Sequence, residues 1–288
     1  MNPQSIELLV PAFAFALGAI IGSFLNVVIY RLPRRAEGLS IASPTYSYCP
    51  KCGTTIRGYD NIPLLSYFLL GARCRACKVK IPIRYFCVEL LTACLFAGIA
   101  IQHQPEWGVI AVYAGLTACL VSASFIDIDL TIIPDEISLP GIALAPLVSA
   151  AVPELHAPGD LAALGLAVAD PRWAAAAASV AGILAGGLLI YAIGVLGKLA
   201  FRKEAMGFGD VKLFAMIGGY LGWKAVLLAL FIACIAGALA GLVRLALTRE
   251  STIPFGPFLS IGAISVMLWR SEIVRFIFVD YPSYMRHA

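Results

Sequence analysis

Long apolar stretches alternate with short polar connections along most of this chain. Five of the stretches carry no formal charge: residues 8–30, 107–126, 173–197, 225–243 and 252–269. A bilayer core is about 30 Å thick, so a helix that crosses it needs about 20 mainly apolar residues. Each of these stretches therefore predicts a transmembrane helix.

Three further stretches carry a weaker pattern. Residues 85–105 contain one acid, Glu89, and residues 137–153 are somewhat short, but tilt or interfacial extension would allow both to cross. Residues 211–223 offer an 11-residue uncharged run after Lys212, which predicts a short helix buried among its neighbours. The pattern predicts an all-α polytopic membrane protein with about eight transmembrane helices.

Composition and charge agree with a membrane protein and suggest its orientation. Hydrophobic residues make up 60% of the chain, charged residues 13%, and the mean hydropathy is +0.89. The connection 31–84 holds ten of the 21 Lys and Arg residues, and basic loops stay in the cytoplasm. That connection is predicted to be cytosolic, and the loop 153–172 to lie outside. The net charge of +4 thus reflects topology rather than nucleic-acid binding.

The cytosolic connection contains two C-x-x-C pairs, Cys49 with Cys52 and Cys74 with Cys77. Two such turns can supply the four thiolates of a tetrahedral zinc site, and the alternative is a pair of disulfides. A reducing cytosol disfavours disulfides, so a structural zinc is expected. The chain is then predicted to have three parts: a first transmembrane helix, 1–30; a zinc-ribbon-like cytosolic insert, 31–84; and a multi-helix membrane domain, 85–288.

The predicted topology brings two distant acids to the same side of the membrane. Asp127 follows the span 107–126 at its cytoplasmic end, and Asp210 lies in "GFGD" at the cytoplasmic start of the segment 211–223. When two carboxylates share a proton, their repulsion raises one pKa, so one acts as base and the other as acid. Such a pair can activate water for attack on an amide.

Spacing alone leaves several ordinary roles open for these acids. Asp210 could cap a helix that starts at Val211. Asp127, Asp129 and Asp135 could be solvated loop acids, with Asp135 capping the next helix. A proton-coupled transporter would use similar carboxylates, and a zinc-stabilised membrane scaffold would need none of them.

Other peptidase chemistries lack the residues that they need. His103, His156 and His287 are the three histidines, and all are expected in loops or in the tail on the outer side. A buried Ser-His pair is therefore not expected, and there is no H-E-x-x-H zinc helix. Nucleotide-binding motifs are also absent: the sequence has no Walker A loop and no G-x-G-x-x-G after a strand.

Five motifs occur in a distinctive order: "GSFLNVVIYRLPR" at 22–34, the two cysteine pairs around "NIPLLSYFLL", "RYFCVELLTA" at 84–93, "IDIDLTIIPDEI" and "GFGDVKL". In these motifs the chain resembles the bacterial type IV prepilin leader peptidase family, whose members are aspartic peptidases of the GxGD type. Asp127 matches the first catalytic aspartate of the family and Asp210 the second.

The resemblance implies an enzyme of the bacterial inner membrane whose active site faces the cytoplasm. Its partners would be membrane lipid and its substrates, type IV prepilins or type II secretion pseudopilins, whose leader it removes. Many members then methylate the new N-terminal residue with S-adenosylmethionine. Ala72 stands where the family commonly has glycine, so a peptidase without methyltransferase activity is the alternative.

Overall fold

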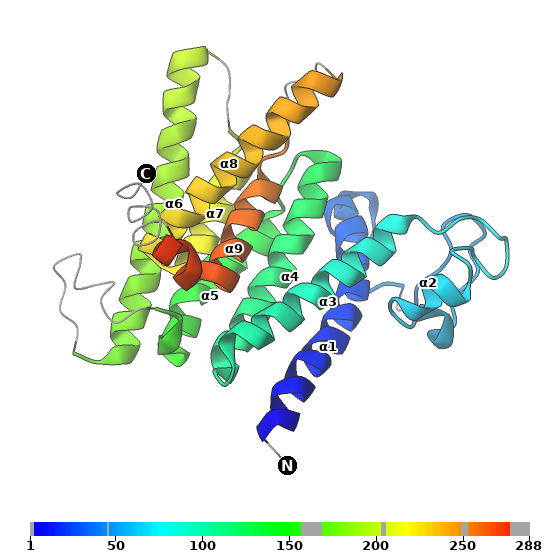
Figure 1. Cartoon of the computed structure of the whole chain (residues 1–288). Helices are drawn as coiled ribbons and strands as arrows, with labels where there is room; N and C mark the ends of the chain where they lie inside the picture. The colour runs from blue at the N-terminus through cyan, green and yellow to red at the C-terminus, as the bar shows by residue number, and fades with distance from the viewer. Residues whose placement is uncertain (1–2, 45, 157–168, 203–205, 249–252, 277–288) are drawn as a thin grey trace, which may run out of the picture. The chain divides into compact units, whose positions relative to one another are not determined.

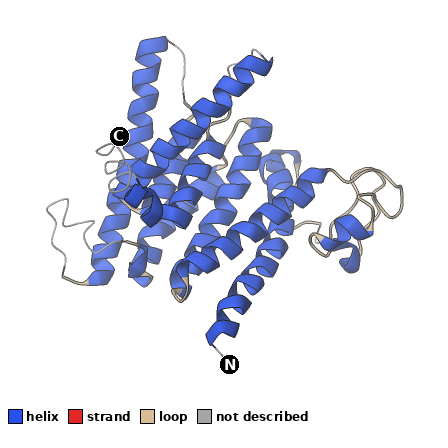
Figure 2. Cartoon of the chain, in the orientation of Figure 1, coloured by secondary structure: helices blue, strands red, loops and turns tan. Residues whose placement is uncertain are grey.

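The computed structural model describes residues 3–44, 46–156, 169–202, 206–248 and 253–276. Within these ranges the regular structure is helical, with no strand and two isolated β-bridges (Figure 2). The chain divides into two compact units, Met1–Ile126 (unit 1) and Asp127–Ala288 (unit 2), and each is described by itself.

Unit 1 contains two long helices, α1 (Pro3–Arg31) and α3 (Ile83–His103), that pack against each other (Figure 1). Ala14, Phe96 and Ala100 form a buried cluster in this unit. The connection between α1 and α3 forms the insert, which contains three short helices: η1 (Leu32–Glu37), η2 (Gly58–Asn61) and α2 (Leu65–Leu69). A further helix, α4 (Trp107–Leu130), begins in unit 1 and ends in unit 2.

Unit 2 is arranged around one short buried helix, α7 (Phe208–Leu221). Every residue from Leu213 to Leu221 is buried, because α7 packs against four neighbouring helices. The helices of this unit that follow α4, with the short η3, are α5 (Asp135–Ala151), η3 (Pro153–Leu155), α6 (Pro171–Phe201), α7, α8 (Trp223–Thr248) and α9 (Gly256–Arg275). The prediction that residues 211–223 form a short helix buried among its neighbours is confirmed.

Two glycines allow α6 and α7 to touch through their backbones. A Cβ on Gly182 would collide with the carbonyl oxygen of Gly218, and a Cβ on Gly218 would collide with that of Gly182. Helices in a membrane gain little from the hydrophobic effect, so they associate through close packing of small residues of this kind. The contact fixes the position of α7 along α6, and therefore the position of Asp210.

In the part of the chain that the structure describes, six helices are long and apolar enough to cross a membrane: α1, α3, α4, α6, α8 and α9. They correspond to the five uncharged stretches and to residues 85–105, so those predictions are confirmed. The helices α5 and α7 form where they were expected, but their 17 and 14 residues span only about 26 and 21 Å. The last helix begins at Gly256, four residues after the predicted 252.

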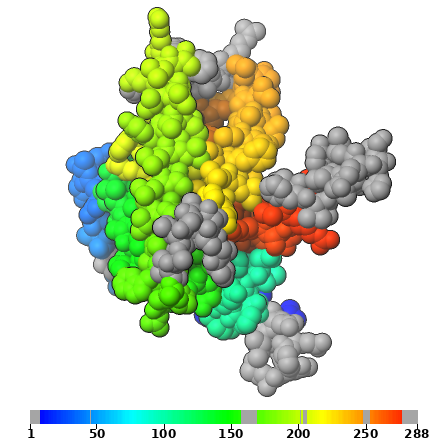
Figure 3. Space-filling model, turned by 90° about the vertical axis from the view of Figure 1, so that its left-hand side faces the viewer, coloured from blue at the N-terminus to red at the C-terminus, as the bar shows by residue number. Residues whose placement is uncertain are grey.

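The surface of unit 2 suits a lipid environment. Figure 3 shows α6, in yellow-green, and α8, in yellow to orange, side by side on one face. Along α6, Leu184, Leu188 and Leu196 are 55%, 62% and 64% exposed. Apolar surface this extensive is rare on a soluble monomer. The chain is a multi-pass membrane protein; its division at residues 30 and 84 stays a prediction.

Candidate active site

Asp127 lies in the last turn of α4 and is almost completely buried, with 5% of its surface exposed. Its Oδ2 accepts a hydrogen bond of 2.9 Å from the backbone N–H of Gly256, which is 129 residues away in the chain. Gly256 is the first residue of α9. The carboxylate therefore connects the end of α4 to the start of α9.

This approach of α9 to Asp127 requires a glycine. A Cβ on Gly256 would lie 2.7 Å from Asp127 Oδ2 and 3.3 Å from Ile133 Cδ1. Carbon and oxygen atoms that are not bonded do not normally come as close as 2.7 Å, so the carboxylate would have to move. Nothing in the sequence pattern pointed to Gly256, because the contact depends on how α9 packs.

Asp210 is the third residue of α7, and Gly207 precedes the helix as its N-cap. Its Oδ2 accepts a hydrogen bond of 3.2 Å from the N–H of Gly207. The alternative in which Asp210 caps a helix starting at Val211 is therefore wrong, because the helix begins three residues earlier, at Phe208.

The environment of Asp210 disfavours its charge. Asp210 belongs to α7, which is not among the six helices long and apolar enough to cross a membrane. Partial burial and the negative charge of Asp127 together raise the pKa of Asp210 to about 6, although the Gly207 hydrogen bond opposes this. The two carboxylates therefore interact, as the predicted topology requires.

The segment after Asp127 packs against the start of α7. A Cβ on Gly209 would lie 3.1 Å from the Cβ of Ile133. Lys212 donates hydrogen bonds of 2.6 and 2.8 Å to the two carboxylate oxygens of Asp135, the first residue of α5. Asp135 is not the cap that was considered for this helix, because Pro134 is its N-cap and makes no side-chain cap bond.

The prediction that no buried Ser-His pair would form is wrong. His156 is buried, and its Nε2 lies 2.9 Å from Ser149 Oγ, so a buried Ser-His pair does exist. Ser149 has no exposed surface and lies about 21 Å along α5 from Asp135. Because both side chains are buried at the end of α5 far from Asp135, a peptide substrate cannot reach this pair. His103 ends α3, and His287 lies outside the described residues.

The two cysteine pairs form matching turns in the insert. Gly53 donates its N–H to Cys49 O at 2.8 Å, and Lys78 donates to Cys74 O at 3.0 Å. Both turns carry a residue with positive φ directly after the second cysteine, and both are flanked by an antiparallel bridge. The turns therefore present their sulfur atoms in the same way.

The four sulfur atoms of Cys49, Cys52, Cys74 and Cys77 come together in a group that fits a metal ion. All of them lie within 4.8 Å of one another, and the Cys49 and Cys77 sulfurs are 3.8 Å apart. Four sulfurs at 2.3 Å from a tetrahedral zinc would be about 3.8 Å apart. The hydroxyl and backbone of Thr54 lower the pKa of Cys52 to about 6, whereas burial and the neighbouring thiols raise the pKa of Cys77 to about 11, so the fit to a metal rests on the sulfur geometry. All eight cysteines are free in this structure.

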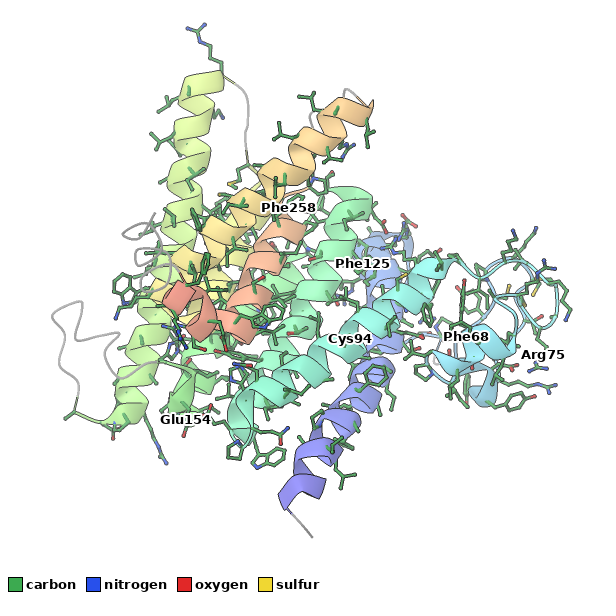
Figure 4. All side chains as sticks on the ribbon, in the orientation of Figure 1. Phe68, Arg75, Cys94, Phe125, Glu154 and Phe258 are labelled. Atoms are coloured by element: carbon green, nitrogen blue, oxygen red, sulfur yellow. The ribbon has the colours of Figure 1, made fainter. Side chains whose placement is uncertain are left out.

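Contacts within unit 1 hold the insert against α3. Glu89 of α3 accepts a hydrogen bond of 2.8 Å from the N–H of Leu64, and the rings of Phe68 and Phe86 are 5.1 Å apart. Asp60 and Arg75 form an ion pair of 2.6 Å in the insert, and Figure 4 shows Arg75 and Phe68 there. The metal cluster is thereby connected to the membrane helix α3.

Two family profiles match the chain. The "Bacterial Peptidase A24 N-terminal domain" matches residues 16–103, and the "Type IV leader peptidase family" matches residues 114–242. A curated protein of Aeromonas hydrophila, named prepilin leader peptidase/N-methyltransferase, is 35% identical over 94% of each chain. Proteins with the same name from Aeromonas salmonicida (strain A449) and Pseudomonas aeruginosa are 36% and 35% identical over 92% and 90% of each chain. The chain belongs to the type IV leader peptidase family. No solved structure matches it.

Ala72 stands where the leader peptidase family commonly has glycine, and its backbone conformation is one that glycine adopts. Its φ of +54° lies in the left-handed region, which glycine adopts readily and alanine does not. The backbone at this position therefore keeps the conformation expected for the glycine that the family commonly has there. Its amide and carbonyl remain bonded, to Tyr67 O and from the N–H of Ile81, both at 2.8 Å.

Proposed function

We propose that this member of the leader peptidase family is a prepilin leader peptidase whose catalytic residues are Asp127 and Asp210. The observation that carries the proposal is the meeting of these acids from α4 and α7 at one end of unit 2, with the charge of Asp127 raising the pKa of Asp210. The relatives are named prepilin leader peptidase/N-methyltransferase, and a prepilin is the substrate that we propose from that name.

In hydrolysis one of the two acids acts as the general base and the other as the general acid. The ionised carboxylate takes a proton from water, which attacks the carbonyl carbon of the scissile bond. The protonated acid donates a hydrogen bond, and then its proton, to the carbonyl oxygen as negative charge develops there. A pKa of about 6 keeps a useful fraction of Asp210 protonated near neutral pH. The base then gives the proton that it took from water to the amide nitrogen, the C–N bond breaks, and the leader leaves as a carboxylic acid, with no covalent intermediate.

The location of the acids supports a peptidase over a transporter. Asp127 is the fourth residue from the end of α4, and Asp210 is the third residue of α7. A proton relay through the bilayer would need acids nearer the middle of a span. Acids at helix ends suit a substrate that enters from the aqueous side of the interface.

The orientation follows from the distribution of basic residues. We propose that the protein lies in the bacterial inner membrane with the insert and both aspartates on the cytoplasmic side. A prepilin or pseudopilin would lie with its apolar helix in the bilayer and its basic leader in the cytosol. The scissile bond would then reach the membrane surface where the two acids meet.

Two further parts of the proposal concern the insert and the second activity. The Cys49, Cys52, Cys74 and Cys77 thiolates would hold a structural zinc, which would stabilise an insert too small for a core of its own. Because the relatives are named as N-methyltransferases, we include methyl transfer from S-adenosylmethionine to the new N-terminal amine. Lipid is the other expected partner, and nucleic acid is not expected.

The test is leader removal by purified protein in detergent. Wild-type protein should convert a prepilin to the mature form, detected by mass spectrometry. Asp127→Asn and Asp210→Asn should each lower the rate at least about 10³-fold, because one carboxylate cannot supply both base and acid. Asp129→Asn is the matched control, since this acid on the same turn is exposed.

The outcomes separate the parts of the proposal. Wild-type protein that leaves prepilin intact would refute the peptidase function. If Asp129→Asn abolishes cleavage while Asp127→Asn does not, the assignment within "DIDLTIIPD" is wrong. Methyl transfer is tested on a mature pilin incubated with Asp210→Asn enzyme and S-adenosylmethionine. A gain of one methyl group shows that the second activity is present and separate from cleavage.

A further inference from the structure

The start of α9 supplies a backbone amide to Asp127, and this amide has no role in the two-carboxylate mechanism of hydrolysis. The first N–H groups of a helix have no partner within that helix. In α9 the N–H of its first residue, Gly256, donates to Asp127 Oδ2 at 2.9 Å, and both residues are buried. This donor reaches the acid from a helix that lies beyond residues 16–103 and 114–242, the ranges that the two family profiles match.

We propose that Gly256 is the positioning residue of Asp127, and that its amide makes Asp127 the general base of the pair. The inference rests on the proposed peptidase function and adds a role for α9 to it. A backbone amide that points at a carboxylate stabilises the ionised form, which is the form that a base needs. Asp210 accepts a longer bond, 3.2 Å from the N–H of Gly207, and is left as the acid.

Steric contact requires glycine at this position. A Cβ at position 256 would meet Asp127 Oδ2 at 2.7 Å and Asp127 Cγ at 3.3 Å. The same Cβ would also lie 3.3 Å from Ile133 Cδ1, so it would be crowded by Asp127 and by Ile133. Either α9 or the carboxylate would have to shift, and both shifts lengthen the hydrogen bond.

The other charges at this end of unit 2 do not replace the amide. Lys212 is engaged by Asp135, and α9 has no charged residue before Arg270. Besides Asp127, the charged groups at the corresponding ends of these helices are Asp129 of α4, Asp135 and Glu136 of α5, Lys198 of α6, Asp210 and Lys212 of α7, and Arg244 of α8. Arg84 of α3 also lies against α4, where its guanidinium donates a hydrogen bond of 3.1 Å to Phe125 O and packs over the Phe125 ring.

The first experiment compares two substitutions of glycine by alanine in unit 2. Gly256→Ala should lower kcat for leader removal by about 10- to 100-fold with little change in KM, because a general base displaced by even about 1 Å takes the proton from water poorly. Gly241→Ala on α8 is the control. The nearest atom to its new Cβ would be 3.8 Å away, so it should cleave at the wild-type rate.

The second experiment removes the donor without adding an atom. An ester in place of the amide between Phe255 and Gly256 replaces the N–H by oxygen. We expect the acidic limb of the kcat/KM profile to move to higher pH, because a carboxylate without its donor is protonated more easily. The alkaline limb should stay in place, since it reports the acid. A structural role alone would lower activity without moving one limb.

The results distinguish a failure of the proposed role of Gly256 from a failure of the proposed peptidase function. If wild-type protein cleaves prepilin, and both the Gly256→Ala and the ester variants cleave with wild-type kcat and an unchanged acidic limb, the role of Gly256 is refuted while the peptidase function stands. If the alkaline limb moves instead, Asp127 is the acid. Wild-type protein without cleavage would refute the proposed function itself.

Discussion

Replacing Asp210 by asparagine should stabilise the protein while it abolishes cleavage. The pKa of Asp210 is raised from 3.8 to about 6, mainly by burial and then by the charge of Asp127. A carboxyl group whose pKa is higher in the folded state prefers to be protonated there. Its contribution to stability is therefore complete below pH 4 and is lost as the pH rises through about 6.

The size of the effect follows from this pKa. A rise of about two pKa units, at 1.36 kcal/mol each, corresponds to about 3 kcal/mol of stability lost by wild-type protein above pH 7. Asparagine has no charge to bury, and its side-chain oxygen can still accept the N–H of Gly207. Asp210→Asn should thus gain up to about 3 kcal/mol at pH 8 and little or nothing at pH 4.

Thermal unfolding in one detergent, measured across this pH range, gives the comparison. The difference in midpoint between Asp210→Asn and wild-type protein should grow by several degrees from pH 4 to pH 8. Asp129→Asn serves as the control, because substitution of an exposed acid usually changes stability by less than about 0.5 kcal/mol. Its difference from wild type should not follow the same curve.

Two results would contradict this reasoning. An Asp210→Asn protein that is less stable than wild type at pH 8 would mean that the carboxylate is satisfied in its ionised form. A gain that is equal at pH 4 and pH 8 would mean that asparagine improves packing or hydrogen bonding and that charge plays no part. In either case Asp210 would not be the protonated member of the pair.

Three other predictions concern the insert and the ion pair. Purified protein should contain about one zinc per chain by elemental analysis, and Cys74→Ser with Cys77→Ser should remove it; four oxidised thiols in protein kept from air would contradict this. Ala72→Gly should stabilise the insert by up to about 1 kcal/mol in denaturant titration, because it relieves a left-handed alanine, and a loss of stability would refute the strain. Lys212→Asp should lower cleavage a few-fold, and adding Asp135→Lys should restore part of it; no recovery would show that the ion pair does not align the acids.

Hydropathy and spacing predicted the parts of this structure that depend on local sequence. The lengths of the spans follow from apolar runs, and the cysteine cluster follows from two C-x-x-C turns with matching backbones. Alternating loops were enough to bring Asp127 and Asp210 to one end. These features need no knowledge of which helix packs against which.

The contacts that could not be predicted all depend on lateral packing between helices. The hydrogen bond from Gly256 joins residues 129 positions apart, and no periodicity carries that information. Burial of His156 depends on η3 folding back on α5, and polar loop residues around it gave no sign of this. The early start of α7 at Phe208 also depends on its neighbours, since glycine on both sides is a poor helix former.

The backbone contact between α6 and α7 also limits how this sequence can change over generations. A clash is usually relieved when a neighbouring side chain becomes smaller, but Gly182 and Gly218 have no side chain to lose. Neither can therefore be substituted first, and a paired substitution only adds a second clash. Random mutagenesis with selection for prepilin cleavage should leave both glycines unchanged, while Leu188 on the exposed side of α6 should accept many apolar residues.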